Sequence, residues 1–327
     1  MKILLTHSPE AFELYYGPRA LEKLRQCGEV IRNDDRDSLQ GEKLIAAARD
    51  CELIVSYRQS PAPAALFERL PRLVAFLRCA IDIRNVDVPA ASRAGVLVTQ
   101  ASAGFVTSVA EQVFGFMIDL ARGVSKSGIS YRNAEVPKAS LGRELKGSTL
   151  GIIGYGQIGR EVARLGKAFG MHVLVSDPYA DVQGFEKVPF EGLLARADFV
   201  VPLAVATAET ENLMDEKAFR GMKKGACFIN VSRGNLVDEA ALEAALDSGR
   251  LGGCALDVGR DPDQMPTPRL AARPDVIATP HSAGLTLPAI EHQSLETAAQ
   301  AAEIVKGRAP KGAVNAEHWT RKELIRK

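Results

Sequence analysis

Three polar residues with complementary chemistry lie in separate segments of the chain. Arg233 is in FINVSRGNLVDEAAL, Asp261 is in CALDVGRDPDQMP and His281 is in VIATPHSAGLT. Histidine is suited to donate a proton near neutral pH, and an acid beside it holds the ring and favours its charged form. Arginine offers a planar fork to a carboxylate. Because hydride addition to a carbonyl leaves negative charge on oxygen, the set suits reduction of a 2-oxo acid.

Each of these residues follows an apolar run that is predicted to be a strand. The three runs are Cys227–Val231, Cys254–Val258 and Val276–Ala278. Ligands of open α/β sheets bind at the carboxyl ends of the strands, so the three side chains are expected at one sheet edge.

Purely structural roles are the alternative for each residue. Taken alone, Arg233 suits a solvated loop cation, Asp261 a turn residue before proline, and His281 a packed core residue. Their common position after successive strands favours the chemical interpretation. Among the other histidines, His7 follows the first predicted strand and is a weaker candidate for the cleft.

A glycine-rich segment precedes this set. The predicted strand Thr149–Ile153 feeds the sequence GYGQIG, which opens a predicted helix. A GxGxxG turn between a strand and a helix lets the backbone approach a pyrophosphate, which then caps the helix N-terminus. The cofactor residues predicted in this turn are Gly154, Gly156, Gln157, Ile158 and Gly159.

An acid stands at the expected distance from the glycine turn. Asp177 lies 18 residues after Gly159, at the end of the next predicted strand. A carboxylate there accepts from both ribose hydroxyls and repels a 2′-phosphate, so the sequence favours NAD over NADP. The alternative is that Asp177 caps a turn before Pro178.

Short apolar runs alternate with longer amphipathic segments, which predicts an α/β fold with doubly wound parallel sheets. Helices are predicted at Pro18–Cys27, Gln40–Arg49 and, long enough to bridge two domains, Gly104–Val124. The remaining predicted strands, beyond the four already given, are Lys2–Thr6, Leu53–Ser56, Leu73–Leu77, Val96–Thr99, Val173–Ser176 and Phe199–Leu203.

Composition narrows the classes of partner. The 327 residues include 41 basic and 40 acidic side chains without segregation, which argues against nucleic-acid binding. No apolar run spans a bilayer and no signal-peptide pattern is present, so a cytoplasmic location is expected. The five cysteines have neither disulfide nor metal-ligand spacing, so no metal is predicted; Cys227 and Cys254 are expected to be buried.

Several segments together resemble the D-isomer-specific 2-hydroxyacid dehydrogenase family. They are VAE at residues 109–111, GYGQIGREVA, NVSRGNLVDEAAL, LDVGRDP and TPHSAG. The resemblance implies that Arg233, Asp261 and His281 are catalytic and that Asp257 lies by the nicotinamide. The further cofactor contacts that it implies are Val231, Arg233, His281 and Ala283.

The family resemblance also implies a domain plan. A nucleotide domain, residues 100–284, is inserted into a discontinuous flavodoxin-like substrate domain formed by residues 1–99 and 285–327. The nucleotide domain is expected to form a homodimer. With 43 residues after Gly284, no appended regulatory domain is expected.

Departures from the family pattern fall on the substrate side. Ala80, Ile81 and Asp82 replace glycines in CAIDIRNVD, and Asp82 is an unusual neighbour for an anion unless Arg58 or Arg84 neutralises it. The predicted substrate residues are therefore Arg58, Ile81, Asp82, Arg84, Arg233 and His281.

Two further departures concern other loops. Asp261 stands where the family usually has glutamate, in a loop that is one residue shorter. Leu203–Ala206 replaces a His-Leu-Pro-Leu segment, and Gln112 replaces a histidine that often follows VAE. None of these changes removes the hydride chemistry.

The sequence thus predicts an NAD-dependent oxidoreductase for a small 2-hydroxy acid and 2-oxo acid pair, such as glyoxylate or hydroxypyruvate. The alternative is an NAD(H)-sensing binding protein, similar to a corepressor, that has little turnover. An oxidoreductase for a non-carbon acid such as phosphite has no positive support in the sequence.

Overall fold

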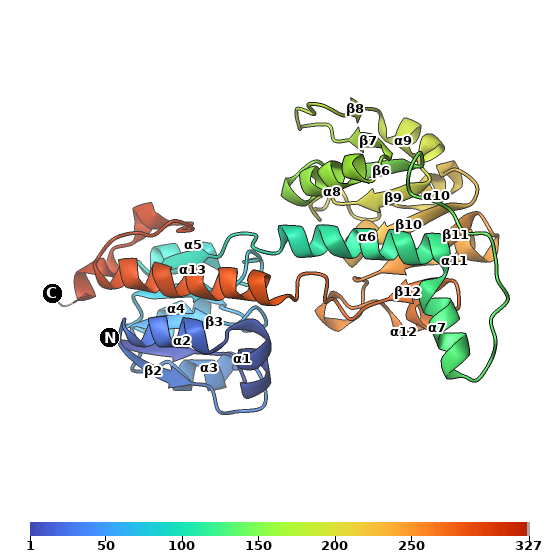
Figure 1. Ribbon diagram of the computed structural model, residues 1–327. Coiled ribbons are helices and arrows are strands. Elements are labelled where there is room, and N and C mark those ends of the chain that lie inside the picture. Colours follow the sequence, from blue (N-terminus) through green and yellow to red (C-terminus); the bar gives the residue numbers. More distant parts are fainter. Residues whose placement is uncertain (326–327) are drawn as a thin grey trace. The chain divides into compact units, whose positions relative to one another are not determined.

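The computed structural model describes residues 1–325, which form two compact units (Figure 1). Unit 1 comprises Met1–Phe105 together with the chain from Leu285 onward, and unit 2 is Val106–Gly284. Each unit is built on a parallel sheet with helices, so the predicted α/β class is confirmed. The first boundary lies at residue 105, whereas the sequence predicts residue 99.

Unit 1 contains a five-stranded sheet in the order β2-β1-β3-β4-β5, which is the flavodoxin-like order. β3 and β4 are buried along their whole length, as expected for parallel strands covered on both faces. The sequence did not predict β2, because all of its residues are exposed or partly exposed. The strands are β1 Lys2–Leu5, β2 Glu29–Arg32, β3 Leu53–Ser56, β4 Ala75–Arg78 and β5 Leu97–Gln100.

Helices from both ends of the chain cover this sheet. α13 packs against α2 and β4, and Figure 1 shows α13 in orange beside α2 in blue. Thr99 Oγ1 donates to Gln300 Oε1 at 2.7 Å, and Trp319 Nε1 donates to the Val74 carbonyl at 3.1 Å. The helices of unit 1 are α1 Pro9–Tyr15, α2 Pro18–Arg25, α3 Gly41–Ala47, α4 Ala64–Arg69, α5 Val88–Arg93 and α13 Leu287–Val305, with 3₁₀ turns Ala316–His318 and Arg321–Leu324.

Unit 2 contains a seven-stranded parallel sheet in the order β12-β11-β10-β9-β6-β7-β8. The order reverses between β6 and β9, which is the switch point of a doubly wound sheet. Six strands were predicted; β8 was missed because it has only two residues, both exposed. The strands are β6 Thr149–Ile153, β7 His172–Ser176, β8 Glu186–Lys187, β9 Phe199–Pro202, β10 Ala226–Asn230, β11 Leu251–Leu256 and β12 Val276–Ala278.

The long helix α6 belongs to unit 2, where it packs against α8, β10 and β11. Its apolar stripe, which includes Val109, Val113 and Met117, is buried as its helical spacing predicts. The helix ends at Arg122, because Gly123 has a left-handed φ of 65°. The helices of unit 2 are α6 Val106–Arg122, α7 Val124–Arg132, α8 Gln157–Ala168, α9 Phe190–Arg196, α10 Glu216–Gly221, α11 Glu239–Asp247 and α12 Pro268–Ala271, with 3₁₀ turns Gly234–Leu236 and Pro262–Gln264.

Residues 1–325 contain neither a membrane-spanning helix nor a metal-binding cluster. Within that range no helix is long and apolar enough to cross a membrane, and no cluster of three or more His, Cys, Asp or Glu side chains could hold a metal ion. Cys227 and Cys254 are buried as predicted, and burial raises the pKa of the Cys227 thiol to about 11.

Candidate active site

The turn between β6 and α8 requires glycine at two positions. Gly154 has a φ of 98°, and a Cβ there would lie 2.6 Å from the Ala204 nitrogen on the loop after β9. A Cβ at Gly159 would lie 2.3 Å from the Gly154 carbonyl oxygen. Gly156 differs, because a Cβ there would meet no described atom within 4 Å. The turn therefore packs closely against β9 but leaves open space over its central glycine.

The N-terminus of α8 faces this turn. Gly156 is its N-cap and no side chain among the described residues caps it, so Gln157 and Ile158 begin the helix with uncapped backbone N–H groups. Such groups and the helix dipole favour a negatively charged ligand. The open space, the close turn and the uncapped helix fit a dinucleotide pyrophosphate.

Asp177 follows β7 and holds the glycine turn. Its Oδ2 accepts from the Tyr155 N–H at 2.7 Å, and its Oδ1 accepts from the N–H groups of Tyr179 and Ala180, both at 2.9 Å. Partial burial opposes ionisation, but these bonds outweigh it and hold the pKa of Asp177 below its ordinary value. Asp177 is thus an ionised acceptor that also caps the following turn.

Arg233 lies after β10 on a loop that Asn230 organises. Asn230 is buried; its Nδ2 donates to the Arg233 carbonyl at 2.9 Å and its Oδ1 accepts from the Ser232 N–H at 3.1 Å. The Arg233 Nη1 donates to the Ser232 carbonyl at 2.7 Å, and Val231 is buried. The sequence analysis missed Asn230, although an amide at the end of an apolar strand is a detectable signal.

Asp257 directly follows the core strand β11 and is 1% exposed. Its Oδ1 accepts from Thr279 Oγ1 at 2.6 Å and from the Ser282 N–H at 2.8 Å, while its Oδ2 accepts from the Ala283 N–H at 3.0 Å. These bonds place the loop after β12 against the loop after β11. Asp257 therefore supports the segment that carries His281.

His281 has a left-handed backbone, with a φ of 51°. Its N–H donates to the Asp257 carbonyl at 2.9 Å. Its Nδ1 lies 2.6 Å from the Asp263 carbonyl oxygen. Because a carbonyl oxygen can only accept, Nδ1 carries the proton in this arrangement, and Nε2 of the neutral ring is therefore a hydrogen-bond acceptor.

The predicted acid Asp261 lies on the same loop as this carbonyl. The Asp261 N–H donates to the Met265 carbonyl at 3.1 Å. Asp263 and Gln264, which follow it, have left-handed φ values of 57° and 60°. The role of Asp261 in holding the imidazole stays a prediction, whereas the structure gives Nδ1 a main-chain partner.

The predicted substrate residues of unit 1 follow β3 and β4. Arg84 forms a fork on Asp82, with Nε–Oδ1 at 3.0 Å and Nη2–Oδ2 at 2.6 Å, so Arg84 neutralises this carboxylate. Arg58 stacks over the Tyr15 ring, 4.9 Å from its centroid. Ile81 is exposed in the same segment as Asp82.

Arg78 organises these two loops and was missed by the sequence analysis. It is fully buried at the end of β4 and donates to the carbonyl oxygens of Tyr57 and Ser60 and to Asn85 Oδ1. Burial lowers the pKa of Arg78 to about 10, and Asp82 opposes that shift. Its partners lie 7 to 21 residues away on two different loops, so no local pattern reveals its role.

Comparisons with known proteins agree with this architecture. The family model described as D-isomer specific 2-hydroxyacid dehydrogenase, NAD binding domain, matches residues 114–283. D-3-phosphoglycerate dehydrogenase of Rattus norvegicus is 34% identical over 306 residues, which are 90% of this chain and 57% of that protein. The Methanocaldococcus jannaschii protein of the same name is 31% identical over 93% of this chain and 59% of its own length. The chain thus spans little more than half the length of these curated relatives.

Solved structures match over nearly the whole chain. The TT0316 protein from Thermus thermophilus has a TM-score of 0.86 and 28% identity, covering 96% of this chain and 100% of that chain. D-lactate dehydrogenase from Escherichia coli has a TM-score of 0.81 and 28% identity, with the same coverage. The family match covers the unit that holds the glycine turn, Arg233 and His281. The chain therefore belongs to the D-isomer-specific 2-hydroxyacid dehydrogenase family.

Proposed function

We propose that the protein is an NAD-dependent oxidoreductase that interconverts a small 2-oxo acid and its D-2-hydroxy acid. The observation that carries the proposal is the imidazole of His281, whose Nδ1 is fixed on a main-chain carbonyl at 2.6 Å. This bond supports Nε2 of the protonated ring as the proposed proton donor in the reduction direction. The family membership supports the reaction class.

The proposed roles divide between binding and proton transfer. His281 donates a proton from Nε2 to the substrate oxygen, and Arg233 binds the carboxylate and polarises the carbonyl. Asp261 is the proposed acid that supports the imidazolium. A bound NADH supplies the hydride for the carbonyl carbon. The cofactor is held by the glycine turn, by Asp177 and by residues of the loops after the central strands, which are Val231, Arg233, Asp257, His281 and Ala283.

NAD rather than NADP is the proposed cofactor. Asp177 is an ionised carboxylate at the end of β7, and three backbone N–H groups fix its position. A carboxylate accepts from ribose hydroxyls and repels a 2′-phosphate. These properties support a preference for NADH.

Unit 2 is the proposed nucleotide domain and unit 1 the proposed substrate domain. Arg58, Ile81, Asp82 and Arg84 are the proposed substrate contacts of unit 1. The Asp82–Arg84 fork removes the objection that an unpaired carboxylate would repel an anionic substrate. Glyoxylate and hydroxypyruvate are the proposed substrates, and the solved structures that resemble this chain include a glyoxylate reductase from Paecilomyes thermophila.

We also propose that the chain forms a homodimer through unit 2. Every residue of α7 is exposed or partly exposed. Exposed apolar side chains gather on α7 and on the segment after it; they are Val124, Ile129, Tyr131, Val136 and Leu141. A concentration of this kind is typical of an interaction surface. A cytoplasmic location stays a prediction.

A spectrophotometric scan tests the activity. In separate assays the protein and NADH are mixed with glyoxylate, hydroxypyruvate, pyruvate or a bulkier 2-oxo acid. The absorbance of NADH is followed in each assay. Oxidation of NADH that depends on at least one of these acids is expected. Tight NADH binding without turnover of any acid would instead support the alternative of an NAD(H)-sensing protein.

A further inference from the structure

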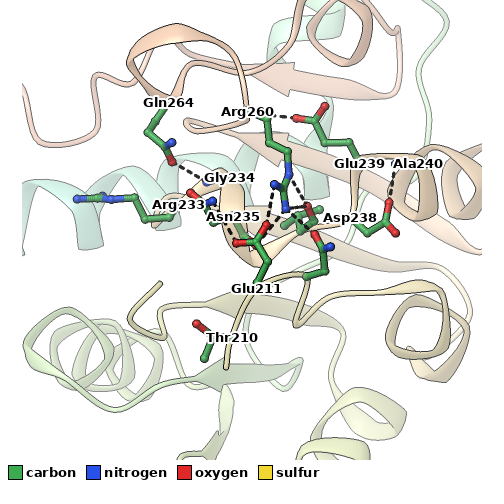
Figure 2. Close-up of polar contacts among 12 residues, drawn as sticks. Thr210, Glu211, Arg233, Gly234, Asn235, Asp238, Glu239, Ala240, Arg260 and Gln264 are labelled. Atoms are coloured by element: carbon green, nitrogen blue, oxygen red, sulfur yellow. Dashed lines mark hydrogen bonds and ion pairs between the residues drawn. The ribbon is translucent and has the colours of Figure 1, made fainter. Parts of the chain in front are cut away.

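Arg260 joins three loops at the carboxyl edge of the unit 2 sheet. It lies on the loop after β11 and its side chain is 33% exposed. Its Nη1 donates to Glu211 Oε1 at 2.8 Å, and its Nη2 donates to Asn212 Oδ1. Glu211 and Asn212 both lie on the loop after β9. Its Nε and Nη2 donate to the Val237 carbonyl, at 3.1 and 3.0 Å, on the loop after β10. Figure 2 shows this guanidinium at the centre of the contacts.

The loops after β10 and β11 also touch through their backbones. A Cβ on Gly234 would lie 2.0 Å from the Gly259 carbonyl oxygen, so no side chain fits between them. The Arg260 N–H donates to Glu239 Oε1 at 3.2 Å, at the start of α11. Gly234 follows Arg233 directly, and Gly259 precedes Arg260. The guanidinium therefore fastens a contact next to the proposed carboxylate-binding residue.

Gln264 forms the second link between these loops. Its Oε1 accepts from the Gly234 N–H at 3.2 Å, and its carbonyl accepts from the Gly259 N–H at 2.8 Å (Figure 2). The preceding residue, Asp263, supplies the carbonyl that holds the Nδ1 of His281. One short segment thus contacts the backbone beside Arg233 and the imidazole of His281.

We propose that Arg260 and Gln264 are positioning residues that act as a loop brace for the two proposed catalytic groups. Arg260 fixes the loop after β11 on its neighbours, and Gln264 sets the distance between that loop and the backbone that follows Arg233. The Asp263 carbonyl is then held where it fixes the tautomer of His281. Figure 2 shows the Arg233 guanidinium pointing away from the Arg260 cluster. The effect of the brace on turnover rests on the proposed function. Its effect on the tautomer of the His281 ring does not.

The test compares Arg260→Gln with a matched control, Arg273→Gln. Arg273 also joins separate segments of unit 2, through Asp247 at 2.7 Å and Asp275 at 2.9 Å, and its side chain is 22% exposed. Each variant therefore removes a partly exposed arginine that joins separate segments of unit 2, with one ion pair lost in Arg260→Gln and two in Arg273→Gln. Gln264→Leu removes the acceptor for Gly234 without touching Arg260, and Gln264→Glu keeps an acceptor oxygen there.

Nitrogen NMR of the histidine rings gives a readout that does not depend on turnover. Assignment uses His281→Gln, which removes the His281 signal. In the wild type, Arg273→Gln and Gln264→Glu, neutral His281 is expected to carry its proton on Nδ1. In Arg260→Gln and Gln264→Leu the proton population is expected to move to Nε2. Retention of the Nδ1 proton in both of those variants would overturn the brace.

Kinetics with NADH and the best 2-oxo acid give the second readout. Arg260→Gln and Gln264→Leu are expected to lower kcat/KM by about 10- to 100-fold, because misplacing a reacting group by about 1 Å has an effect of that size. Their Kd for NADH stays within about twofold of wild type. Equal kinetics in Arg260→Gln and Arg273→Gln would overturn the brace. A wild-type protein without turnover would instead overturn the proposed function. The tautomer of His281, measured by NMR, would still test the brace.

Discussion

His281 takes its orientation from main-chain oxygens on the loop after β11. Its N–H donates to the Asp257 carbonyl, and its Nδ1 donates to the Asp263 carbonyl. A fixed ring with a defined tautomer presents one nitrogen to a ligand, which is the requirement for a general acid. The sequence indicated His281 from its place after a strand, but it could not indicate a main-chain partner from another loop.

Replacement of His281 by glutamine removes the proposed proton donor. We expect kcat to fall by about 100- to 10,000-fold, the range for loss of a general acid or base. His281 is only one of several proposed cofactor contacts, and the glycine turn and Asp177 are untouched, so the Kd for NADH should change far less than kcat. Steady-state kinetics and NADH fluorescence titration measure the two quantities. Parallel loss of turnover and of binding would contradict the assigned role.

His7 is a buried histidine and not the second cleft residue that its position after β1 suggested. It is 1% exposed, with ring centroids of Tyr16 and Tyr57 at 5.0 and 5.2 Å. Burial, and secondarily the charge of Arg78, lower the pKa of His7 to about 3. The apolar rings around it are contributed by distant segments, which is why the sequence alone did not show its burial.

The lowered pKa makes stability depend on pH. Unfolded His7 titrates near 6.5, so between about pH 6.5 and pH 3 the unfolded chain binds the proton and the native chain does not. Stability is full above that window and falls as pH falls through it. Urea titrations at pH 7.5 and pH 5 should show that wild type loses about 2 kcal/mol more unfolding free energy than His7→Phe. An equal loss in both proteins would contradict neutral burial of His7.

At the scale of elements, the β6–α8 connection forms the cofactor turn. Gly154 and Gly159 have no room for a Cβ, whereas a Cβ at Gly156 would meet no described atom within 4 Å. The φ of Gly156 is −75°, which any residue adopts. The fold therefore requires glycine at positions 154 and 159. Glycine at position 156 is required only by the proposed contact with the cofactor.

Gly156→Ala tests this separation. We expect the Tm to stay within about 2 °C of wild type, because the added methyl group causes no clash or strain. The Kd for NADH should rise about tenfold or more, because the methyl group occupies the backbone approach to the pyrophosphate. Gly128→Ala on α7, where a Cβ also meets nothing within 4 Å, is the control for both measurements. Unchanged NADH affinity in Gly156→Ala would place the pyrophosphate elsewhere.

Sequence patterns predicted some strands with the correct bounds and missed others. β6 and β12 have the predicted bounds, because each is an apolar run between clear turn signals. β2 and β8 were missed because all of their residues are exposed or partly exposed, so no buried apolar run marks them in the sequence. Arg78 and Arg260 were missed for another reason: their partners are main-chain and side-chain atoms of loops that only the fold brings together.

At the scale of the molecule, unit 1 depends on both ends of the chain. Gln300 Nε2 donates to the Gln100 carbonyl at 2.9 Å and to the Lys311 carbonyl at 3.0 Å, and Trp319 packs into the same core as the N-terminal strands. Alternation of strands and helices predicted the sheets, but only the family resemblance suggested that the chain returns to its first domain. A contact between residues about 200 positions apart leaves no periodic signal in the sequence.

The dimer proposal makes a prediction about mass in solution. Ile129→Glu places a charge on the exposed apolar surface of α7, and burying an unpaired charge in an interface is unfavourable. Light scattering after gel filtration should give the mass of two chains for wild type and of one chain for the variant. Leu14→Glu, at an exposed apolar residue of unit 1, should remain a dimer. A monomeric wild type at micromolar concentration would contradict the proposal.

The most direct test of the central claim follows the hydride itself. The wild-type protein is incubated with NADH that carries deuterium at both C4 positions and with the best 2-oxo acid of the panel other than glyoxylate, whose reduction product glycolate has no D or L form. The product is analysed by chiral chromatography and mass spectrometry. The expected product is a D-2-hydroxy acid with one deuterium on C2. An L product, a product without deuterium, or no 2-hydroxy acid from any member of the panel would contradict the claim.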